Sequence, residues 1–223
     1  MSSVDVELGV VALAAMLSPT TLTASVLALV LSDRPARTGL LFYIGALAAT
    51  LAVGVLGALV LGDAAASSEP GSPKTWVSLF DVLAGALIVV FVLRAASRPA
   101  DPERAKRTVE QMRGISAAPA LAIVLAGATL ANAGGFMPLA LKEISQLDPS
   151  SSEYLGLWAA FALVSLLPLL AALVMLVLAR ERTQRLLIRV RAWLERHART
   201  IAEAILLLLA AVLLRNGVAG LTG

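Results

Sequence analysis

The chain carries, from Met16 to Ser25, the stretch Met-Leu-Ser-Pro-Thr-Thr-Leu-Thr-Ala-Ser inside an otherwise apolar run over about 8–31. Pro19 has no amide hydrogen to donate to the carbonyl of Ala15, and it restrains Ser18 away from helical angles. Serine followed by proline also suits a helix N-cap and the first helical position. At a rise of about 1.5 Å per residue, the break falls roughly 15 Å into the run. The stretch therefore predicts two half-helices, the second beginning near the middle of the run.

Six apolar runs of this kind predict a membrane protein. Hydrophobic residues make up 59% of the 223 residues and charged residues only 15%, which does not fit a soluble domain. About 20 apolar residues suffice to cross a hydrocarbon core roughly 30 Å thick. The runs lie at about 8–31, 39–61, 76–96, 118–140, 154–179 and 200–220. We expect an all-α polytopic membrane protein with six transmembrane helices in one transmembrane domain, residues 1–223.

A second break is predicted in the fourth run. Asn132 can cap a helix, paired glycines at Gly134 and Gly135 loosen the helix, and Pro138 leaves the carbonyl of Gly134 without its partner. The first and fourth runs are corresponding members of two sets of three. Because three is odd, the second set is inserted upside down, as in transporters built from inverted repeats. We expect repeat one over about 8–96, a cytoplasmic loop over about 97–117, and repeat two over about 118–220.

The breaks are the expected substrate-binding site. A half-helix that begins at mid-membrane presents free backbone NH groups and the positive end of its dipole to a phosphate, sulfate or carboxylate. Hydroxyl and amide side chains add neutral hydrogen bonds that orient a substrate and still release it. The predicted substrate-binding residues are Ser18, Pro19, Thr20, Thr21, Asn132, Gly134 and Pro138.

The third and sixth runs each contain an acid that has a basic residue about 18–20 Å further along the helix. The pairs are Asp81 with Arg94, and Glu203 with Arg215. That spacing is shorter than the hydrocarbon core, so at least one charge of each pair lies in or at the edge of the membrane. Such charges mark a pathway or a pairing. Asp81 and Glu203 are therefore candidate gating or proton-coupling groups, and snorkelling ends are the alternative. In the fifth run, Pro168 predicts a packing bend.

Loop charges set the expected orientation. Fifteen Lys and Arg residues lie in three loops on one side, against Lys74, Lys142 and Arg215 on the other. The positive-inside rule places the rich side in the cytoplasm and both termini outside the plasma membrane. No Lys or Arg precedes the first run, so we expect it to be retained rather than cleaved. The 180–199 segment is amphipathic and is expected to lie in the interface, where it contacts anionic lipid headgroups or fixes the topology.

Composition argues against several classes of chemistry. The chain has no cysteine and one histidine, so disulfides, thiol redox chemistry, metal sites and bound cofactors are not expected. His197 lies among arginines in a surface segment, which argues against an enzyme. Membrane orientation accounts for the basic loops, so no nucleic-acid partner is expected.

Three features together resemble a known family. They are the Ser18-Pro19-Thr20-Thr21 break, the entry Arg-Thr-Gly-Leu-Leu-Phe-Tyr-Ile-Gly over 37–45, and the long basic loop between the third and fourth runs. The chain resembles the sulfolipid-1-addressing and peptidoglycolipid-addressing proteins of the lysine-exporter superfamily. The resemblance implies a transporter that exports or flips an anionic or glycosylated cell-envelope lipid. Metal exporters of that superfamily carry acids in their broken spans, whereas this chain has none there, which disfavours cation export.

Two alternatives stay open from the sequence. One is export of an amino acid or another small metabolite, held through its carboxylate by the same dipoles. The other is a non-transporting scaffold for envelope-lipid assembly, with the basic loops as docking surfaces. Expected partners are the membrane lipid or glycolipid substrate, anionic headgroups at the inner surface, and either a second copy of the chain or a protein of lipid synthesis or export. The chain has no glycine-rich nucleotide loop, so drive by ATP requires such a partner.

Overall fold

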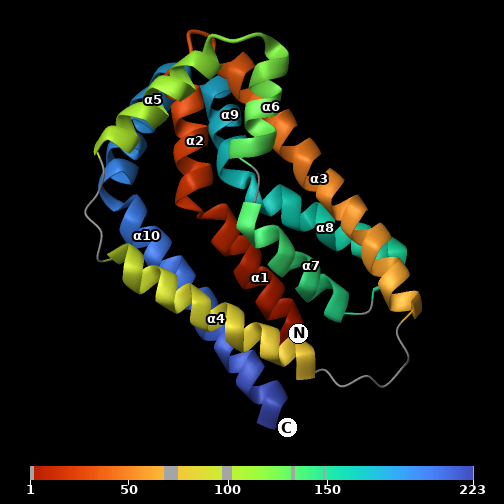
Figure 1. Cartoon of the computed structure of the whole chain (residues 1–223). Coiled ribbons are helices and arrows are strands. Elements are labelled where there is room, and N and C mark those ends of the chain that lie inside the picture. Colours follow the sequence, from red (N-terminus) through yellow and green to blue (C-terminus); the bar gives the residue numbers. More distant parts are fainter. Residues whose placement is uncertain (1–2, 68–74, 97–101, 132–133, 148, 223) are drawn as a thin grey trace. The chain divides into compact units, whose positions relative to one another are not determined.

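A computed structural model describes residues 3–67, 75–96, 102–131, 134–147 and 149–222 of the chain (Figure 1). These residues form ten α-helices and one short 3-10 helix, with no strand among them. The helices are α1 (Ser3–Met16), α2 (Pro19–Val30), α3 (Pro35–Ser67), α4 (Thr75–Ala96), α5 (Pro102–Ser116), α6 (Ala120–Leu130), η1 (Gly134–Phe136), α7 (Met137–Gln146), α8 (Ser151–Ser165), α9 (Leu167–Leu178) and α10 (Arg180–Thr222).

Several of these helices are long and apolar enough to cross a membrane. Three stretches qualify alone. They are Glu7–Val30, which contains most of α1 and all of α2, Pro35–Gly57 in α3, and Arg180–Leu221 in α10. Two bent pairs qualify together, Ala120–Leu130 with Gly134–Ser145, and Ser151–Ser165 with Leu167–Leu178. The described part of the chain thus holds three to five candidate spans, which confirms an all-helical membrane protein. Helix α4 covers the predicted run 76–96 but is not among these spans, and the six-span inverted repeat stays a prediction.

The chain divides into two compact units. The first unit comprises residues 1–60 and 101–198, and the second comprises 61–100 and 199–223. Helices α1, α2 and α5–α9 belong to the first unit, together with most of α3 and the first part of α10. Helix α4 and the remainder of α10 belong to the second.

Aromatic side chains of α8 fix it to α3 in the first unit. The indole Nε1 of Trp158 donates to the carbonyl of Thr50 over 2.8 Å, and the Tyr154 hydroxyl donates to the carbonyl of Gly54 over 3.0 Å. Trp158 is 1% exposed, and a side chain at Gly54 would overlap its indole. Gly54 therefore makes room for the tryptophan that holds the two helices together.

Helices α3 and α6 approach each other through a pair of glycines. A Cβ at Gly45 would overlap the carbonyl of Val124, and a Cβ at Gly127 would overlap the carbonyl of Phe42. Small residues allow this backbone approach, which is the usual source of helix packing in membranes. Gly45 and Gly127 therefore serve the packing of α3 on α6.

Glycines also allow α4 and α10 to pack closely in the second unit. A Cβ at Gly217 would lie 2.7 Å from the carbonyl oxygen of Ser78, and a Cβ at Gly85 would lie 2.8 Å from Cγ of Leu214. These distances are shorter than ordinary carbon contacts, so neither position has room for a side chain without a shift of its neighbour. Here too the helices meet over glycine.

Helix α10 joins two segments that the sequence predicts separately. The expected interfacial helix over 180–199 and the expected span over 200–220 form one helix, Arg180–Thr222. Strong helix formers without a proline or glycine fill the junction, so nothing there interrupts the backbone ladder. Two ion pairs between residues one turn apart support the helix here: Arg191–Glu195 precedes the junction and Arg199–Glu203 spans it, each with N···O at 2.8 Å. The two predicted segments therefore form one continuous helix.

Candidate functional site

The first break lies where the sequence predicts it. Helix α1 ends at Met16 and α2 begins at Pro19, with Ser18 between them at the N-cap position. The carbonyl of Ala15 is not left free, because the amide of Ser18 donates to it over 3.2 Å. The Ser18 hydroxyl does not cap a backbone amide either. It lies 2.9 Å from the hydroxyl of Thr20, so the two side chains bond to each other.

A stripe of buried hydroxyls runs from this break along α2. Ser18, Thr21 and Ser25 follow one another at spacings of three and four, which places them on one helix face. They are 5%, 6% and 5% exposed, and Ser25 Oγ has no hydrogen-bond partner among the described residues. By contrast, the hydroxyls of Thr50 and Thr129 donate to carbonyls four residues back in their own helices. We call Ser18, Thr21 and Ser25 the hydroxyl stripe.

The other predicted residues of the first break differ in exposure. Pro19 is buried and Thr20 is exposed, although both belong to the first turn of α2. Sequence reasoning passed over Ser25. Its signal was the regular spacing from Ser18 and Thr21, which is that of one helix face.

The second break lies in the fourth predicted run, between α6 and α7. The two helices are bent by 50°, and η1 begins with Gly134 at φ 39°, a backbone conformation that favours glycine. Pro138 is exposed and lies in the first turn of α7. Asn132 lies outside the described residues. The second half-helix begins at Met137 rather than at the predicted cap, so the run continues to Ser145 instead of ending near 140.

The two breaks lie side by side within the first unit. Helix α1 packs against α7 and η1, and α2 packs against α6 (Figure 1). The structure thus brings the half-helices of the first run beside those of the fourth, and with them the elements that contain Ser18, Gly134 and Pro138. The substrate-binding role of these residues stays a prediction.

The predicted gating residues belong to the second unit. Asp81 is 3% exposed and has an interaction partner. The Glu203 carboxylate is paired with Arg199 one turn earlier at 2.8 Å and is therefore not an isolated charge. Arg94 and Arg215, their expected counterparts, are both exposed. The gating role of the two acids stays a prediction.

A buried ion pair lies on α7, where sequence reasoning placed an external loop. Lys142 Nζ is 3.5 Å from Glu143 Oε1, and the two side chains are 16% and 4% exposed. The second carboxylate oxygen of Glu143 has no hydrogen-bond partner among the described residues. The pair was missed because the run was ended near 140. A half-helix that begins at Met137 must continue past both residues to span its half of the membrane.

The fifth predicted run is also broken, which sequence reasoning took for a packing bend. Helices α8 and α9 meet at Leu166 with a bend of 57°. Pro168 lies in the first turn of α9, and the Ser165 hydroxyl donates to the carbonyl of Ala162 over 3.0 Å. The proline was the right signal, and the size of its effect was underestimated.

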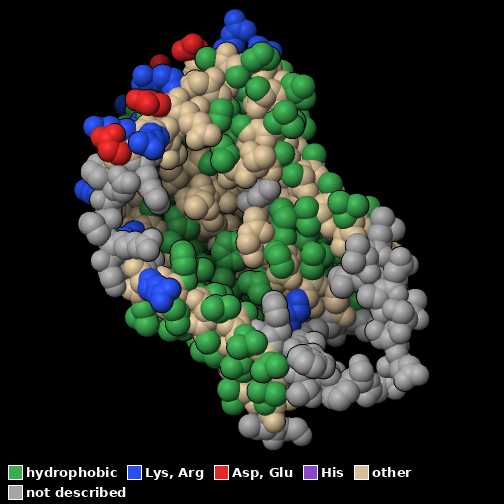
Figure 2. Space-filling view, in the orientation of Figure 1, with side chains coloured by type: hydrophobic (Ala, Val, Ile, Leu, Met, Phe, Trp, Pro, Cys, Tyr) green, Lys and Arg blue, Asp and Glu red, His purple; other side chains and the backbone are tan. Residues whose placement is uncertain are grey.

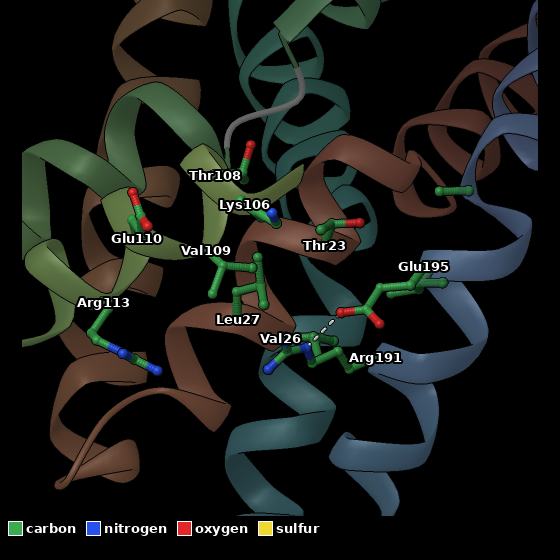
Figure 3. Close-up of a pocket in the computed structure, with 12 residues that line it drawn as sticks. Thr23, Val26, Leu27, Lys106, Thr108, Val109, Glu110, Arg113, Arg191 and Glu195 are labelled. Carbon is green, nitrogen blue, oxygen red and sulfur yellow. Dashed lines mark hydrogen bonds and ion pairs between the residues drawn. The ribbon is translucent and has the colours of Figure 1, made fainter. Parts of the chain in front are cut away.

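A cavity of about 630 Å³ lies in the first unit between α2, α5 and the first part of α10 (Figure 3). Its lining combines apolar side chains with charged ones. Val26 and Leu27 come from α2, whereas Lys106 and Arg113 come from α5 and Arg191 from α10. Figure 2 shows Lys, Arg, Asp and Glu side chains gathered over α5, whereas hydrophobic side chains cover α6 and α3. The cavity lies at this charged end of the unit.

Comparisons with known proteins agree with the sequence resemblance. A family model described as "Sap, sulfolipid-1-addressing protein" matches residues 8–219, nearly the whole chain. No curated protein and no solved structure matches the chain.

Proposed function

The chain belongs to the sulfolipid-1-addressing protein family, and on that premise we propose that it exports or flips an envelope lipid across the plasma membrane. The family description associates it with lipid-related processes of the cell envelope. Transport is the step that we add. We further propose that the protein is a transporter and not an enzyme. Its basic loops are proposed to lie in the cytoplasm, and the chain is proposed to be related to the lysine-exporter superfamily.

The hydroxyl stripe is the observation that carries the proposal. An ordinary anchor helix satisfies each hydroxyl with a carbonyl of its own backbone, as Thr50 does. Ser25 leaves its hydroxyl buried without a partner among the described residues, and such a group costs about 1–3 kcal/mol. A polar headgroup that passes along α2 would supply the missing partner. The stripe thus fits transient rather than permanent binding.

The broken helices supply the second element of the mechanism. Helix α2 begins inside the membrane span Glu7–Val30, so its first amides and its dipole favour an anionic or hydroxyl-rich headgroup there. Because α1 packs on α7 while α2 packs on α6, the half-helices form two pairs on either side of the breaks. Rocking of one pair against the other would open the stripe first to one leaflet and then to the other. Asp81 and Glu203 are proposed as gating or proton-coupling groups in the same cycle.

The test is complementation of a host that lacks the gene. Variants are compared by the ratio of surface-extractable lipid to retained lipid, measured by mass spectrometry. Replacement of Ser18-Pro19-Thr20 by Ala-Leu-Ala, and separately Ser25→Ala, should reduce the ratio to that of the deletion strain. Thr129→Ala is the matched control, since this exposed hydroxyl bonds only within α6, and it should restore the parental ratio.

Folding of each variant is checked by its amount in the membrane and its melting temperature in detergent. A folded Ala-Leu-Ala variant that restores the parental ratio would refute the site. A lipid lost equally from both fractions in the deletion strain would favour a scaffold, and an unchanged lipid profile would favour export of a small metabolite.

A further inference from the structure

We propose that the cavity between α2, α5 and α10 binds the headgroup of an anionic membrane lipid, with Arg113 as its principal cation. That the transported lipid binds here before it crosses the membrane rests on the proposed function, whereas the binding of an anionic lipid does not. The ligand is an amphiphile with a phosphate or sulfate headgroup, taken from the adjoining leaflet. At about 630 Å³, the cavity is of the size that takes a headgroup together with the first part of a chain.

The charged lining residues are the cations Lys106, Arg113 and Arg191 and the acids Glu110 and Glu195. Among these cations, Arg113 is singled out by its lack of an ion pair with a described residue. Arg191 forms an ion pair with Glu195 of the same helix at 2.8 Å (Figure 3). Lys106 forms an ion pair with Glu103 at 3.2 Å. Arg113 forms no ion pair with any residue that the structure describes, although it lines the same cavity. Its guanidinium has five donors in a planar fork, which suits two oxygens of a phosphate or sulfate.

The apolar wall distinguishes a lipid from a soluble anion. Val26 and Leu27 of α2, Val109 of α5 and Leu194 of α10 line the cavity beside the charges. Leu27 and Leu194 are 3% and 2% exposed, so this wall is continuous with the packed interior. A free anion gains nothing from such a wall, whereas an acyl chain gains roughly 25 cal/mol for each Å² of apolar surface that it buries.

Helix α2 contributes to the cavity with one face and to the hydroxyl stripe with the other. Thr23 lines the cavity and lies two residues from both Thr21 and Ser25, which places it on the opposite face of the half-helix from the stripe. At about 1.5 Å per residue, Thr23 is less than 10 Å along the axis from the break at Ser18. A headgroup held by Arg113 would thus contact the same half-helix as the stripe, and it would pass round α2 to reach the hydroxyls.

The experiment measures lipid binding by the purified full chain. The protein is reconstituted in phosphatidylcholine nanodiscs that contain a small fraction of photoactivatable phosphatidylglycerol, with the diazirine near the headgroup. Cross-linked residues are mapped by mass spectrometry. We expect labels on the cavity walls of α2, α5 and α10, and about tenfold less label there in Arg113→Glu, because reversal of the charge replaces attraction with repulsion.

Two further variants separate the site from general charge and from folding. Arg107→Glu makes the same charge change at an exposed position of α5 outside the cavity lining and should keep the parental labelling. Val109→Trp fills the cavity without a change of charge and should lower the labelling. The Ala-Leu-Ala replacement at the break should bind lipid normally while transport is lost, so failure of binding and failure of transport are distinguished.

The contrary results are equally definite. Equal labelling in Arg113→Glu, in Val109→Trp and in the parent would overturn the site. Equal labelling by a photoactivatable phosphatidylcholine would overturn selection for an anionic headgroup. Displacement of the lipid by free sulfate at matched concentration would show a site for soluble anions, and that too would overturn the proposal.

Discussion

The indole of Trp158 donates a hydrogen bond to the backbone carbonyl of Thr50 over 2.8 Å and so ties α8 to α3 at a buried point of the first unit. The Thr50 hydroxyl already donates to the carbonyl of Ala46 over 2.9 Å, so the polar groups of Thr50 are used within the helix pair. This contact is permanent packing, in contrast to the hydroxyl stripe of α2.

Replacement of the indole should destabilise the protein. Trp158→Phe removes the donor to Thr50 and leaves a gap beside Gly54, which should cost about 1–3 kcal/mol. The readout is the melting temperature of the purified protein in detergent. Trp193→Phe is the control, because Trp193 is 48% exposed and stacks on His197 of its own helix, and its effect should stay within about 0.5 kcal/mol. Equal effects of the two changes would contradict the assigned packing.

The glycine contact between α3 and α6 should tolerate no side chain. Gly45→Val would place its Cβ against the carbonyl oxygen of Val124, and the backbone cannot move aside as a flexible side chain can. We expect a loss of at least about 1–3 kcal/mol or failure to accumulate in the membrane, read by the amount of folded protein. Gly114→Ala meets nothing within 4 Å in α5 and should be neutral or stabilising by up to about 1 kcal/mol. A harmless Gly45→Val would rule out the close approach.

Separation of Lys142 from Glu143 should be more damaging than removal of both charges. Lys142→Met removes the cation that lies 3.5 Å from Oε1 of Glu143, a side chain that is only 4% exposed. Loss of one partner of a buried ion pair typically costs about 3–5 kcal/mol. The double variant Lys142→Met with Glu143→Gln removes both charges of the pair and should recover most of the stability. A double-mutant cycle of melting temperatures measures the coupling. Additive effects would mean that the two charges do not interact.

Orientation can be tested with single cysteines, since the chain contains none of its own. Arg107→Cys on α5 should react with a membrane-impermeant maleimide only in inside-out vesicles, because the positive-inside rule assigns this segment to the cytoplasm. Ser152→Cys at the start of α8 should react in intact cells. Both positions are exposed, so burial does not limit the reaction. The opposite labelling pattern would invert the topology and with it the direction of transport.

Local chemistry allowed the first break to be predicted, because Pro19 acts on its immediate neighbours whatever surrounds it. The break in the fourth run was likewise signalled by Gly134 and Pro138. The size of the bend at Pro168 was not predictable, since the packing of α8 and α9 on other helices decides how far a proline bends its helix. Sequence periodicity does not report that packing.

Two other features needed tertiary information. The cavity beside α2 forms only because α5 and α10 lie against the same helix, and no motif in the sequence pairs Arg113 with Thr23. The continuation of α7 past Lys142 was hidden because a charged pair ended the apolar run. A hydropathy pattern assigns charged residues to a loop even where two opposite charges neutralise each other inside a membrane span.

Lipid movement is the central claim, and the most direct test is a comparison of the native host with and without this gene. Lipids extractable from the cell surface and lipids retained inside are quantified separately by mass spectrometry, with the restored gene as control. The account predicts a lipid that is lost from the surface and retained inside in the deletion strain, and returned to the surface by the gene. Loss of the same lipid from both fractions, or no change in either, would contradict it.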